Sequence, residues 1–491
     1  MRTPPESSGK SGTGAVLSRL AAHGDRPALL AGGVEHSYRE LLSAAAAVAT
    51  SLRAARGDLA GERVALLAEP GRDFVASLLA IWSVGAIAVP LALSHPEAER
   101  TWLIEDSGAS VVLSAAGVRA LPTGGAPAAE AVDPPALLIY TSGTTSRPKG
   151  VVWSHGMLTW QLETLTRAWG WRADDRTLLA LPLHHVHGLV NVLLCCLWAG
   201  ARCEVLPRFD PEAVWERLAA GEVSVWMAVP TLYHRLLGAW DAAPPAQRER
   251  WAAGARGLRL AVSGSAALPA PLFERWAALA GRPPLERYGM TEIGMALSNP
   301  LDGERVAGSV GSPLPGVEVR RVDEQGQPVA AGETGELEVR GPGVFQTYWR
   351  RPAETAAFRD GWFRTGDVAV CEHGRYRLLG RASQDIVKTG GYKVSALEIE
   401  AVLLGHPAVA ECAVVGLADP EWGERVGAAV VLAPGARVDL EGLRSWAREH
   451  LAPYKLPTRL VVLSELPKNA LGKVVKGELR GRFGEGDESA G

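Results

Sequence analysis

The sequence predicts an α/β protein, and three observations lead to this class. The chain has 491 residues, of which 47% are hydrophobic, so it can form several domains with sizeable cores. Helical patterns alternate with short apolar runs through the N-terminal half, as expected where helices connect parallel strands. Glycines and prolines then recur among short β-type runs from about residue 306, and the pattern changes again near residue 385.

The expected elements follow in order along the chain. Helices are expected over 37–53 and 71–84, where apolar residues recur at helical spacing. The strands expected around them are the apolar runs at 63–67, 87–90, 111–113, 137–140 and 178–181. Residues 120–135, rich in proline, glycine and alanine, are typical of a surface connector. A compact β-rich unit is then expected from the runs at 318–322, 335–340 and 375–379, followed by a small α+β unit.

The composition of the chain argues against several classes of protein. The net charge is −3 and the basic residues are spread, which argues against a nucleic-acid-binding surface. The five cysteines form no C-x-x-C pair, so no zinc framework is expected, and Cys195 and Cys196 are expected in the core. The polar N-terminal sequence lacks a secretory signal, and the longest apolar run, 189–199, is too short to span a bilayer. We therefore expect a soluble cytoplasmic protein.

Residues 140–150, YTSGTTSRPKG, are the most informative stretch of the chain. Their hydroxyls and backbone N–H groups could surround phosphate oxygens, while Lys149 adds a positive charge. The common P-loop needs Gly-Lys-Ser/Thr, and the spacing here differs because Lys149 lies between Pro148 and Gly150. The alternative is an ordinary solvated turn.

A second stretch, ERYGMTE at 286–292, also suits a nucleotide. Tyr288 could stack on a purine, Gly289 would allow close approach of the backbone, and Thr291 could bond a phosphate. Glu292 could hold a magnesium ion, since one carboxylate plus nucleotide phosphates is a common magnesium site. Taken alone, the same stretch could begin a helix with a Thr–Glu cap.

Shorter patterns complete the set. Small residues at 263–265 follow a strand-like run, where a flat base could lie against the backbone at the end of a sheet. The remaining candidates are Asp367 in a TGD sequence, Arg381 in a GR sequence and Lys473 after a glycine near the C-terminus. Each of these alone would be an ordinary turn or surface residue.

In this order, the five stretches resemble the motifs of the acyl-adenylate-forming superfamily of acyl-CoA synthetases, luciferases and peptide-synthetase adenylation domains. The resemblance extends from about residue 25 to 480. It implies a large N-terminal domain over 1–380, made of two α/β sheets and a β-rich subdomain. A hinge at 381–384, pivoting at Ser383 or Gln384, would join it to a small mobile α+β lid over 385–491.

The resemblance also implies roles for residues. Thr291, Glu292 and Lys473 would be catalytic, with Lys473 bridging the acid carboxylate and the α-phosphate as charge develops. Glu292 and Thr145 would hold Mg²⁺. The ATP and AMP site would consist of Thr141, Ser142, Gly143, Thr144, Thr145, Lys149, Ser263, Gly264, Ser265, Tyr288, Gly289, Met290, Asp367 and Arg381. The face that receives coenzyme A would consist of Lys388, Gly390, Gly391 and Tyr392.

Within this site, Asp367 would accept hydrogen bonds from both ribose hydroxyls, and Arg381 would donate to the sugar or to the adjacent phosphate. The chain departs from the family pattern at two places. Ser146 stands where the family usually has glycine, and the hinge region has one apparent extra residue before Asp385.

Arg287 stands where most relatives place a small or apolar residue. A buried guanidinium is costly unless an anion meets it, so a dicarboxylic acid, which brings a second carboxylate, is the expected substrate. Alternatively, Arg287 could pair with Glu286 or Glu292. The acid pocket would also contain His185, His187 and Ser263.

The sequence around Arg287 resembles the malonyl-CoA synthetases. This implies that malonate, with methylmalonate as a second candidate, reacts with ATP to give an acyl-AMP and pyrophosphate, and that the thiol of coenzyme A then forms the thioester. ATP, Mg²⁺ and coenzyme A are expected to take part. A short-chain monocarboxylate synthetase remains open as an alternative. So does a domain that loads a carrier protein, although the chain contains no carrier segment.

Overall fold

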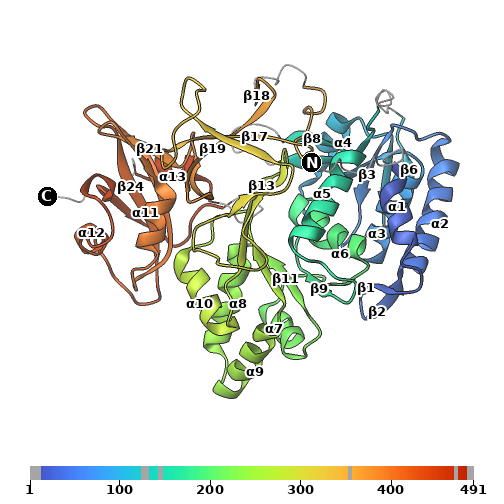
Figure 1. Cartoon of the computed structure of the whole chain (residues 1–491), viewed down its shortest axis with the longest axis horizontal. Helices are drawn as coiled ribbons and strands as arrows, with labels where there is room; N and C mark the ends of the chain where they lie inside the picture. The colour runs from blue at the N-terminus through green and yellow to red at the C-terminus, as the bar shows by residue number, and fades with distance from the viewer. Residues whose placement is uncertain (1–12, 123–131, 142–147, 352–356, 469–473, 484–491) are drawn as a thin grey trace, which may run out of the picture.

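The structure is a computed structural model that describes residues 13–122, 132–141, 148–351, 357–468 and 474–483. Two large α/β parts lie side by side, and the C-terminal unit lies at the far end of the long axis (Figure 1). A β-rich sheet runs along the top between them in this view. The class predicted from the sequence is confirmed: the protein is mixed α/β, with large N-terminal sheets and a small C-terminal unit.

The first sheet has six strands in the order β6-β5-β3-β4-β7-β8. Its central strands are parallel, while the edge strands β6 and β8 run antiparallel to their neighbours. The strands are β3 (Arg63–Leu67), β4 (Ile87–Pro90), β5 (Val111–Ser114), β6 (Gly117–Ala120), β7 (Pro135–Thr141) and β8 (Lys149–Ser154). The helices of this part are α2 (Tyr38–Arg56), α3 (Arg72–Ser83) and α4 (Glu97–Ser107).

Local sequence explains where these helices begin. At the start of α2, the Ser37 hydroxyl accepts the backbone N–H of Glu40, and the Glu40 carboxylate accepts the N–H of Ser37, which is a complete capping box. The buried residues of α2 recur every three or four positions and form one apolar face. The helices expected at 37–53 and 71–84 are therefore present, with ends that differ by up to three residues.

The second sheet has nine strands in the order β15-β14-β13-β12-β11-β9-β10-β1-β2. They are β1 (Pro27–Ala31), β2 (Val34–Ser37), β9 (Arg176–Leu179), β10 (Arg202–Val205), β11 (Val225–Ala228), β12 (Leu260–Ser263), β13 (Leu285–Met290), β14 (Gly294–Ser298) and β15 (Ser312–Pro313). The accompanying helices are α1 (Thr13–Ala21), α5 (His155–Ala168), the π-helix η1 (His187–Leu194), α6 (Cys195–Ala199), α7 (Pro211–Ala219), α8 (Pro230–Ala242), α9 (Pro245–Arg256) and α10 (Ala270–Ala280).

The largest core lies between the two sheets. It joins Leu66 of β3 and Ile139 of β7 to Leu193 of η1 and Val262 of β12. The apolar run at 189–199 is buried here rather than in a membrane, and both neighbouring cysteines are fully buried, as predicted. Among the described helices, none is long and apolar enough to cross a bilayer.

The β-rich sheet and the C-terminal sheet complete the fold. The first consists of β16 (Glu318–Val322), β17 (Gly335–Arg340), β18 (Phe358–Arg359), β19 (Trp362–Glu372) and β20 (Arg375–Arg381). The second consists of β21 (Ile386–Thr389), β22 (Tyr392–Ser395), β23 (Val409–Asp419), β24 (Gly423–Leu432) and β25 (Arg459–Val462). The helices of the C-terminal unit are α11 (Ala396–Leu403), α12 (Leu440–Arg448), the 3₁₀ helix η3 (Pro453–Lys455) and α13 (Lys476–Arg482).

One strand is shifted from its expected place. The apolar run predicted a strand over 178–181, but β9 spans Arg176–Leu179 and pairs residue by residue with β10. The strand begins with the polar residues Arg176 and Thr177. The Thr177 hydroxyl can be buried there because it donates to the carbonyl of Val225 in the neighbouring strand. Apolarity alone therefore misplaced both ends.

Candidate active site

The stretch at 140–150 links two antiparallel strands. β7 ends at Thr141 and β8 begins at Lys149, and the Thr141 hydroxyl donates to the carbonyl of Lys149 at 3.4 Å. The Lys149 ammonium lies 5.3 Å from the centre of the Tyr348 ring. Five predicted site residues lie outside the described part of the chain, namely Ser142, Gly143, Thr144, Thr145 and Lys473, as does Ser146.

The stretch at 286–292 forms β13 and the turn after it, so the alternative of a helix start is wrong. β13 and β14 make an antiparallel hairpin. A side chain at Gly289 would meet the carbonyl oxygen of Gly294 at 2.0 Å, so the pairing of the hairpin itself requires glycine there. The carbonyl of Thr291 accepts the indole N–H of Trp153 at 2.8 Å, which fixes the turn.

Tyr288, Asp367 and Arg381 meet in one cluster. The Tyr288 hydroxyl donates to Asp367 at 2.5 Å, and Arg381 Nε lies 2.9 Å from the other carboxylate oxygen. The backbone N–H of Asp367 also donates to Thr365 Oγ1. Burial, followed by the charge of Asp367, raises the pKa of Tyr288 well above its ordinary value. All three residues were predicted from the sequence as parts of a nucleotide site, but the hydrogen bond from Tyr288 to Asp367 was not predicted.

Glu292 lies at the next corner of the site. It is 6% exposed, and its carboxylate accepts the Tyr348 hydroxyl at 3.1 Å. Burial raises its pKa, because a charged carboxylate is poorly solvated there. Sequence reasoning did not identify Tyr348, because a tyrosine in a loop carries no signal without its spatial neighbours.

Arg287 is the least expected side chain of the site, because it is buried and no described residue supplies a counter-ion. It is 3% exposed, and burial lowers its pKa to about 9. Among the described residues, no neighbouring carboxylate acts on its pKa, and its Nε has no hydrogen-bond partner. The guanidinium lies against the backbone of Gly264, where a side chain would approach it to 2.5 Å.

Ser265 and His187 line the same place. The Ser265 hydroxyl lies 3.4 Å from Arg287 Nη2 and 3.1 Å from His187 Nδ1. Its backbone has a φ of 70°, an unusual conformation for serine that turns the residue toward both partners. Burial, then the charge of Arg287, lowers the pKa of His187 well below 6.5, which favours the neutral imidazole.

Three buried polar atoms in this region have no described partner, namely Arg287 Nε, His187 Nε2 and Ser263 Oγ. Buried polar groups are normally hydrogen-bonded, so such a group of atoms indicates a site for a polar ligand. His185 lies beside His184, with ring centres 4.1 Å apart, two residues before His187. The structure brings Arg287 and His187 together at Ser265, with Ser263 next to Gly264 beside the guanidinium, and their role in binding an acid stays a prediction.

The alternative ion pairs of Arg287 are not formed. Glu286 points elsewhere, where one oxygen accepts the backbone N–H of Gly308 at 3.2 Å, and Glu292 is held by Tyr348. Consecutive residues of a strand point to opposite faces, which separates Glu286 from Arg287. Burial raises the pKa of Glu286 from 4.5 to about 8, despite the backbone N–H groups that favour its charge.

This buried acid makes stability depend on pH. Because the pKa of Glu286 is higher in the folded chain than in the unfolded chain, stability should fall as pH rises from about 4.5 to about 8. Glu286→Gln keeps the acceptor oxygen but removes the charge. We expect it to raise Tm by a few degrees at pH 8.5 and to leave Tm nearly unchanged at pH 5, as measured by thermal unfolding. An equal change at both pH values would contradict the assignment.

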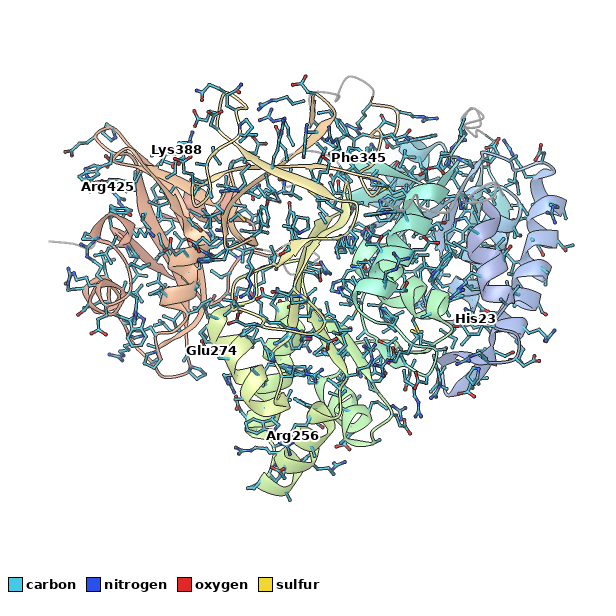
Figure 2. The ribbon with its side chains drawn as sticks, viewed as in Figure 1. His23, Arg256, Glu274, Phe345, Lys388 and Arg425 are labelled. Carbon is cyan, nitrogen blue, oxygen red and sulfur yellow. The ribbon has the colours of Figure 1, made fainter. Side chains whose placement is uncertain are left out.

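The proposed coenzyme A face lies apart from this cluster. Lys393, beside Tyr392, forms a 2.8 Å ion pair with Glu324 in the turn between β16 and β17, and Tyr392 stacks on Tyr454 with ring centres 4.2 Å apart. Figure 2 shows Lys388 at the upper edge of the C-terminal unit, where the hydrogen bond and charge of Lys393, and then the charge of Lys388, lower the pKa of Glu324. Between the two units, the predicted hinge forms a turn in which Gln384 and Asp385 donate their N–H groups to the carbonyl of Arg381.

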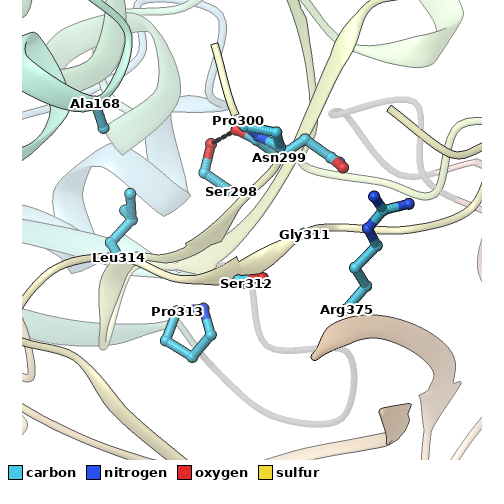
Figure 3. A pocket seen from close by; sticks show the side chains of 9 residues that line it. All are labelled: Ala168, Ser298, Asn299, Pro300, Gly311, Ser312, Pro313, Leu314 and Arg375. Atoms are coloured by element: carbon cyan, nitrogen blue, oxygen red, sulfur yellow. Dashed lines mark hydrogen bonds between the residues drawn. The ribbon is translucent and has the colours of Figure 1, made fainter. Parts of the chain in front are cut away.

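A separate cavity lies at the β14–β15 end of the nine-stranded sheet (Figure 3). None of the predicted site residues lines it. Its wall consists of Ala168, Ser298, Asn299, Pro300, Gly311, Ser312, Pro313, Leu314 and Arg375. We therefore place the candidate active site at Arg287, whose buried charge has no counter-ion among the described residues, and not at this cavity.

Comparison with known proteins places the chain in a family. A family model described as AMP-binding enzyme matches residues 17–349, and one described as AMP-binding enzyme C-terminal domain matches 398–473. The mitochondrial malonate–CoA ligase ACSF3 of Mus musculus is 44% identical over 97% of this chain and 92% of that protein.

Solved structures agree. ATP-bound MatB from Rhodopseudomonas palustris is 34% identical and superimposes with a TM-score of 0.85 over 96% of this chain and 99% of that chain. A malonyl-CoA ligase ternary product complex with methylmalonyl-CoA and AMP is 40% identical, with a TM-score of 0.65 over 91% and 98%. The chain belongs to the AMP-binding enzyme family.

Proposed function

We propose that the protein is an ATP-dependent malonyl-CoA synthetase. Malonate and ATP would give malonyl-AMP and pyrophosphate, and the thiol of coenzyme A would then displace AMP to form the thioester. The names of the similar proteins support the class of reaction. Methylmalonate is a second substrate candidate, because the product complex of a similar ligase contains methylmalonyl-CoA.

The choice of malonate as substrate rests on the Arg287 guanidinium, which forms no ion pair among the described residues. A buried positive charge without a partner destabilises a protein, so its presence calls for an anionic ligand. The carboxylate that reacts at phosphorus is consumed, whereas the second carboxylate of malonate remains available for a bidentate pair. Ser265 and neutral His187 can add hydrogen bonds from the same side. A monocarboxylate would leave the charge unmatched.

The nucleotide would be held by the remaining residues. Asp367, already oriented by Tyr288 and Arg381, is suited to accept the ribose hydroxyls, and Lys149 to meet the phosphates. Gly264 and the residues beside it would lie along the adenine. Thr291 and Met290, in the turn after β13, would lie next to the phosphates.

A magnesium ion fits this site through Glu292. Its buried carboxylate has one described side-chain donor, the Tyr348 hydroxyl, and so retains acceptor capacity. No group of three His, Cys, Asp or Glu side chains among the described residues could hold a metal alone. That suits Mg²⁺, which commonly takes one or two carboxylates and otherwise binds phosphates and water. When bound, the ion would neutralise phosphate charge, with Thr145 as a further ligand.

The two half-reactions would use two faces of the C-terminal unit. Lys473 would face the acid and α-phosphate during adenylation, and rotation at 381–384 would then bring in the face around Lys388, Gly390 and Gly391. The chain resembles ATP-bound MatB more closely in shape than the product complex, although it is more identical in sequence to the latter. This supports the adenylation arrangement for the structure described here.

The exposed lid face suits free coenzyme A. Gly390 and Gly391 have φ values of 55° and 82°; the Trp422 ring lies over Gly390, whereas the space beside Gly391 is open, so a pantetheine arm could pass close to the backbone there. Tyr392, Tyr454 and Trp422 are exposed aromatic side chains around them. The expected cytoplasmic location stays a prediction, because the similar animal ligases are mitochondrial proteins.

A pyrophosphate-release screen over mono- and dicarboxylic acids, at equal concentration with ATP and Mg²⁺, tests the proposed function. Malonate should be the best substrate, with methylmalonate next and acetate and propionate at least tenfold slower. A preference for a monocarboxylate would replace the proposal with a short-chain acyl-CoA synthetase. Thioester formation with free coenzyme A should follow without any carrier protein.

The ribose assignment makes a separate prediction. Asp367→Ala should weaken ATP and AMP about ten- to a hundredfold alike, because each loses hydrogen bonds to a charged acceptor. Titration calorimetry with each nucleotide measures this, and Asp241→Ala, which removes a carboxylate ion-paired on the surface with Arg275, is the control. Unchanged AMP affinity in the Asp367 variant would refute the assignment.

A further inference from the structure

Tyr348 contacts two charged residues of the proposed nucleotide site at once. Its hydroxyl donates to Glu292 at 3.1 Å, and the face of its ring lies 5.3 Å from the Lys149 ammonium. A cation over an aromatic face is attracted to it, and a hydroxyl hydrogen bond to a carboxylate is among the stronger uncharged-to-charged contacts. One side chain therefore links a carboxylate on the turn after β13 to a lysine at the start of β8.

The backbone around Tyr348 is fixed to both of these elements. Tyr348 forms an antiparallel bridge with Val151 of β8, and the N–H of Trp349 donates to the carbonyl of Gly150 at 2.8 Å. Three residues before Tyr348, the N–H of Phe345 donates to the carbonyl of Glu292 at 2.8 Å. The segment 345–349 thus pairs with the turn that carries Glu292 at one end and with the strand that carries Lys149 at the other.

Aromatic packing holds the Tyr348 ring in place. Phe345 packs edge-on against it with ring centres 4.7 Å apart, and is itself 2% exposed. Phe358 and Phe363 pack on the other sides of Phe345, with ring centres 5.6 and 5.3 Å away. Figure 2 places Phe345 at the boundary between the β-rich sheet and the first α/β part. A ring supported in this way can set the position of a partner rather than follow it.

We propose that Tyr348 is a positioning residue for adenylation, which sets the Glu292 carboxylate and the Lys149 ammonium at the separation that magnesium-bound ATP requires. Tyr348 acts through these two residues. The assignment rests on the proposed function only in that the site binds ATP, and it does not depend on which acid is used. Its effect should therefore appear in binding of ATP with Mg²⁺, before any acid is added.

Two substitutions separate the two contacts. Tyr348→Phe removes the hydroxyl and keeps the ring, whereas Tyr348→Leu removes both. By titration calorimetry in the absence of acid, we expect Tyr348→Phe to weaken ATP binding about tenfold at saturating Mg²⁺ and to shift the Mg²⁺ dependence of binding to higher concentration. Tyr348→Leu should weaken it further. AMP binding without Mg²⁺ should change less than twofold in Tyr348→Phe.

A double variant and a matched control complete the test. Because the hydroxyl acts through Glu292, Tyr348→Phe should add almost nothing to Glu292→Gln, whereas independent effects would multiply. Tyr376→Phe, in a half-buried tyrosine of β20, should leave ATP and AMP binding unchanged. Full multiplication in the double variant, equal loss of ATP and AMP binding, or a fall in Tm that accounts for the loss would overturn the proposal. A wild type that binds ATP with Mg²⁺ but adenylates another acid would refute only the choice of malonate.

Discussion

Arg287→Ala should lose malonate activity by about 30-fold to several thousandfold in kcat/KM while improving or sparing monocarboxylates. Removing one partner of a buried charge pair commonly costs about 2–5 kcal/mol, and the substrate carboxylate would lose its only described cationic partner in the pocket. Acetate and propionate have no second carboxylate to lose, and the variant relieves them of an unpaired buried charge. Pyrophosphate release measured for each acid should show selectivity collapsing or inverting, with the KM for ATP nearly unchanged.

Two further variants sharpen this prediction. Arg287→Lys should recover only part of the malonate activity, because a single ammonium cannot reproduce the fork of a guanidinium. Arg305→Ala is the matched control: Arg305 is also buried, but its guanidinium donates to the carbonyls of Pro283, Pro300 and Leu301. That variant should lower stability without changing the order of acids. An equal loss for every acid in Arg287→Ala would show that Arg287 is structural.

Lys473→Ala should reduce pyrophosphate release by several orders of magnitude and spare the second half-reaction. A lysine that stabilises charge developing between the carboxylate and the α-phosphate matters only in that transition state. Thioester formation from prepared malonyl-AMP and coenzyme A should stay within a few-fold of the wild type. Separate assays of the two half-reactions measure the split.

The control for this variant is Lys468→Ala. Lys468 lies in the same C-terminal segment, where it is exposed and ion-paired with Glu411 at 2.6 Å, so its loss should affect neither half-reaction appreciably. If Lys473→Ala impaired both half-reactions equally, the division of labour between the two faces of the lid would be wrong.

Part of the fold could be predicted from local sequence because local physics decides it. The strands at 63–67, 87–90, 318–322 and 335–340 are found at those limits, since short apolar or alternating runs bounded by turns have few other stable conformations. The strand expected at 178–181 was misplaced because its first residues are polar and are satisfied by a neighbouring strand. That neighbour is distant in sequence.

The candidate site divides in the same way. The residues proposed to bind ATP could be predicted by residue type, because phosphate, ribose and magnesium each need particular donors and acceptors. The contacts among these residues could not be predicted from the sequence. Tyr288 was expected to stack on a base, and its hydroxyl was found to donate to Asp367. Gly289 is required because β14 approaches its backbone closely. Tyr348 was missed entirely, since nothing in its own sequence separates it from other loop tyrosines.

The class of fold and the family could be predicted before the structure was known, and the sequence has an arginine at 287, where the family resemblance implies a small or apolar residue. Whether another side chain neutralises that arginine could be seen only from the packing of the folded chain. Glu286, its neighbour in sequence, points away because strand residues alternate between faces. The Glu292 carboxylate accepts a hydrogen bond from Tyr348 instead of pairing with Arg287. Pairing depends on which side chains share a face and which are already bonded, and these are properties of the packed chain. The sequence already led to the expectation of a dicarboxylate, and the fold removes the two alternative partners, Glu286 and Glu292, that could have neutralised Arg287.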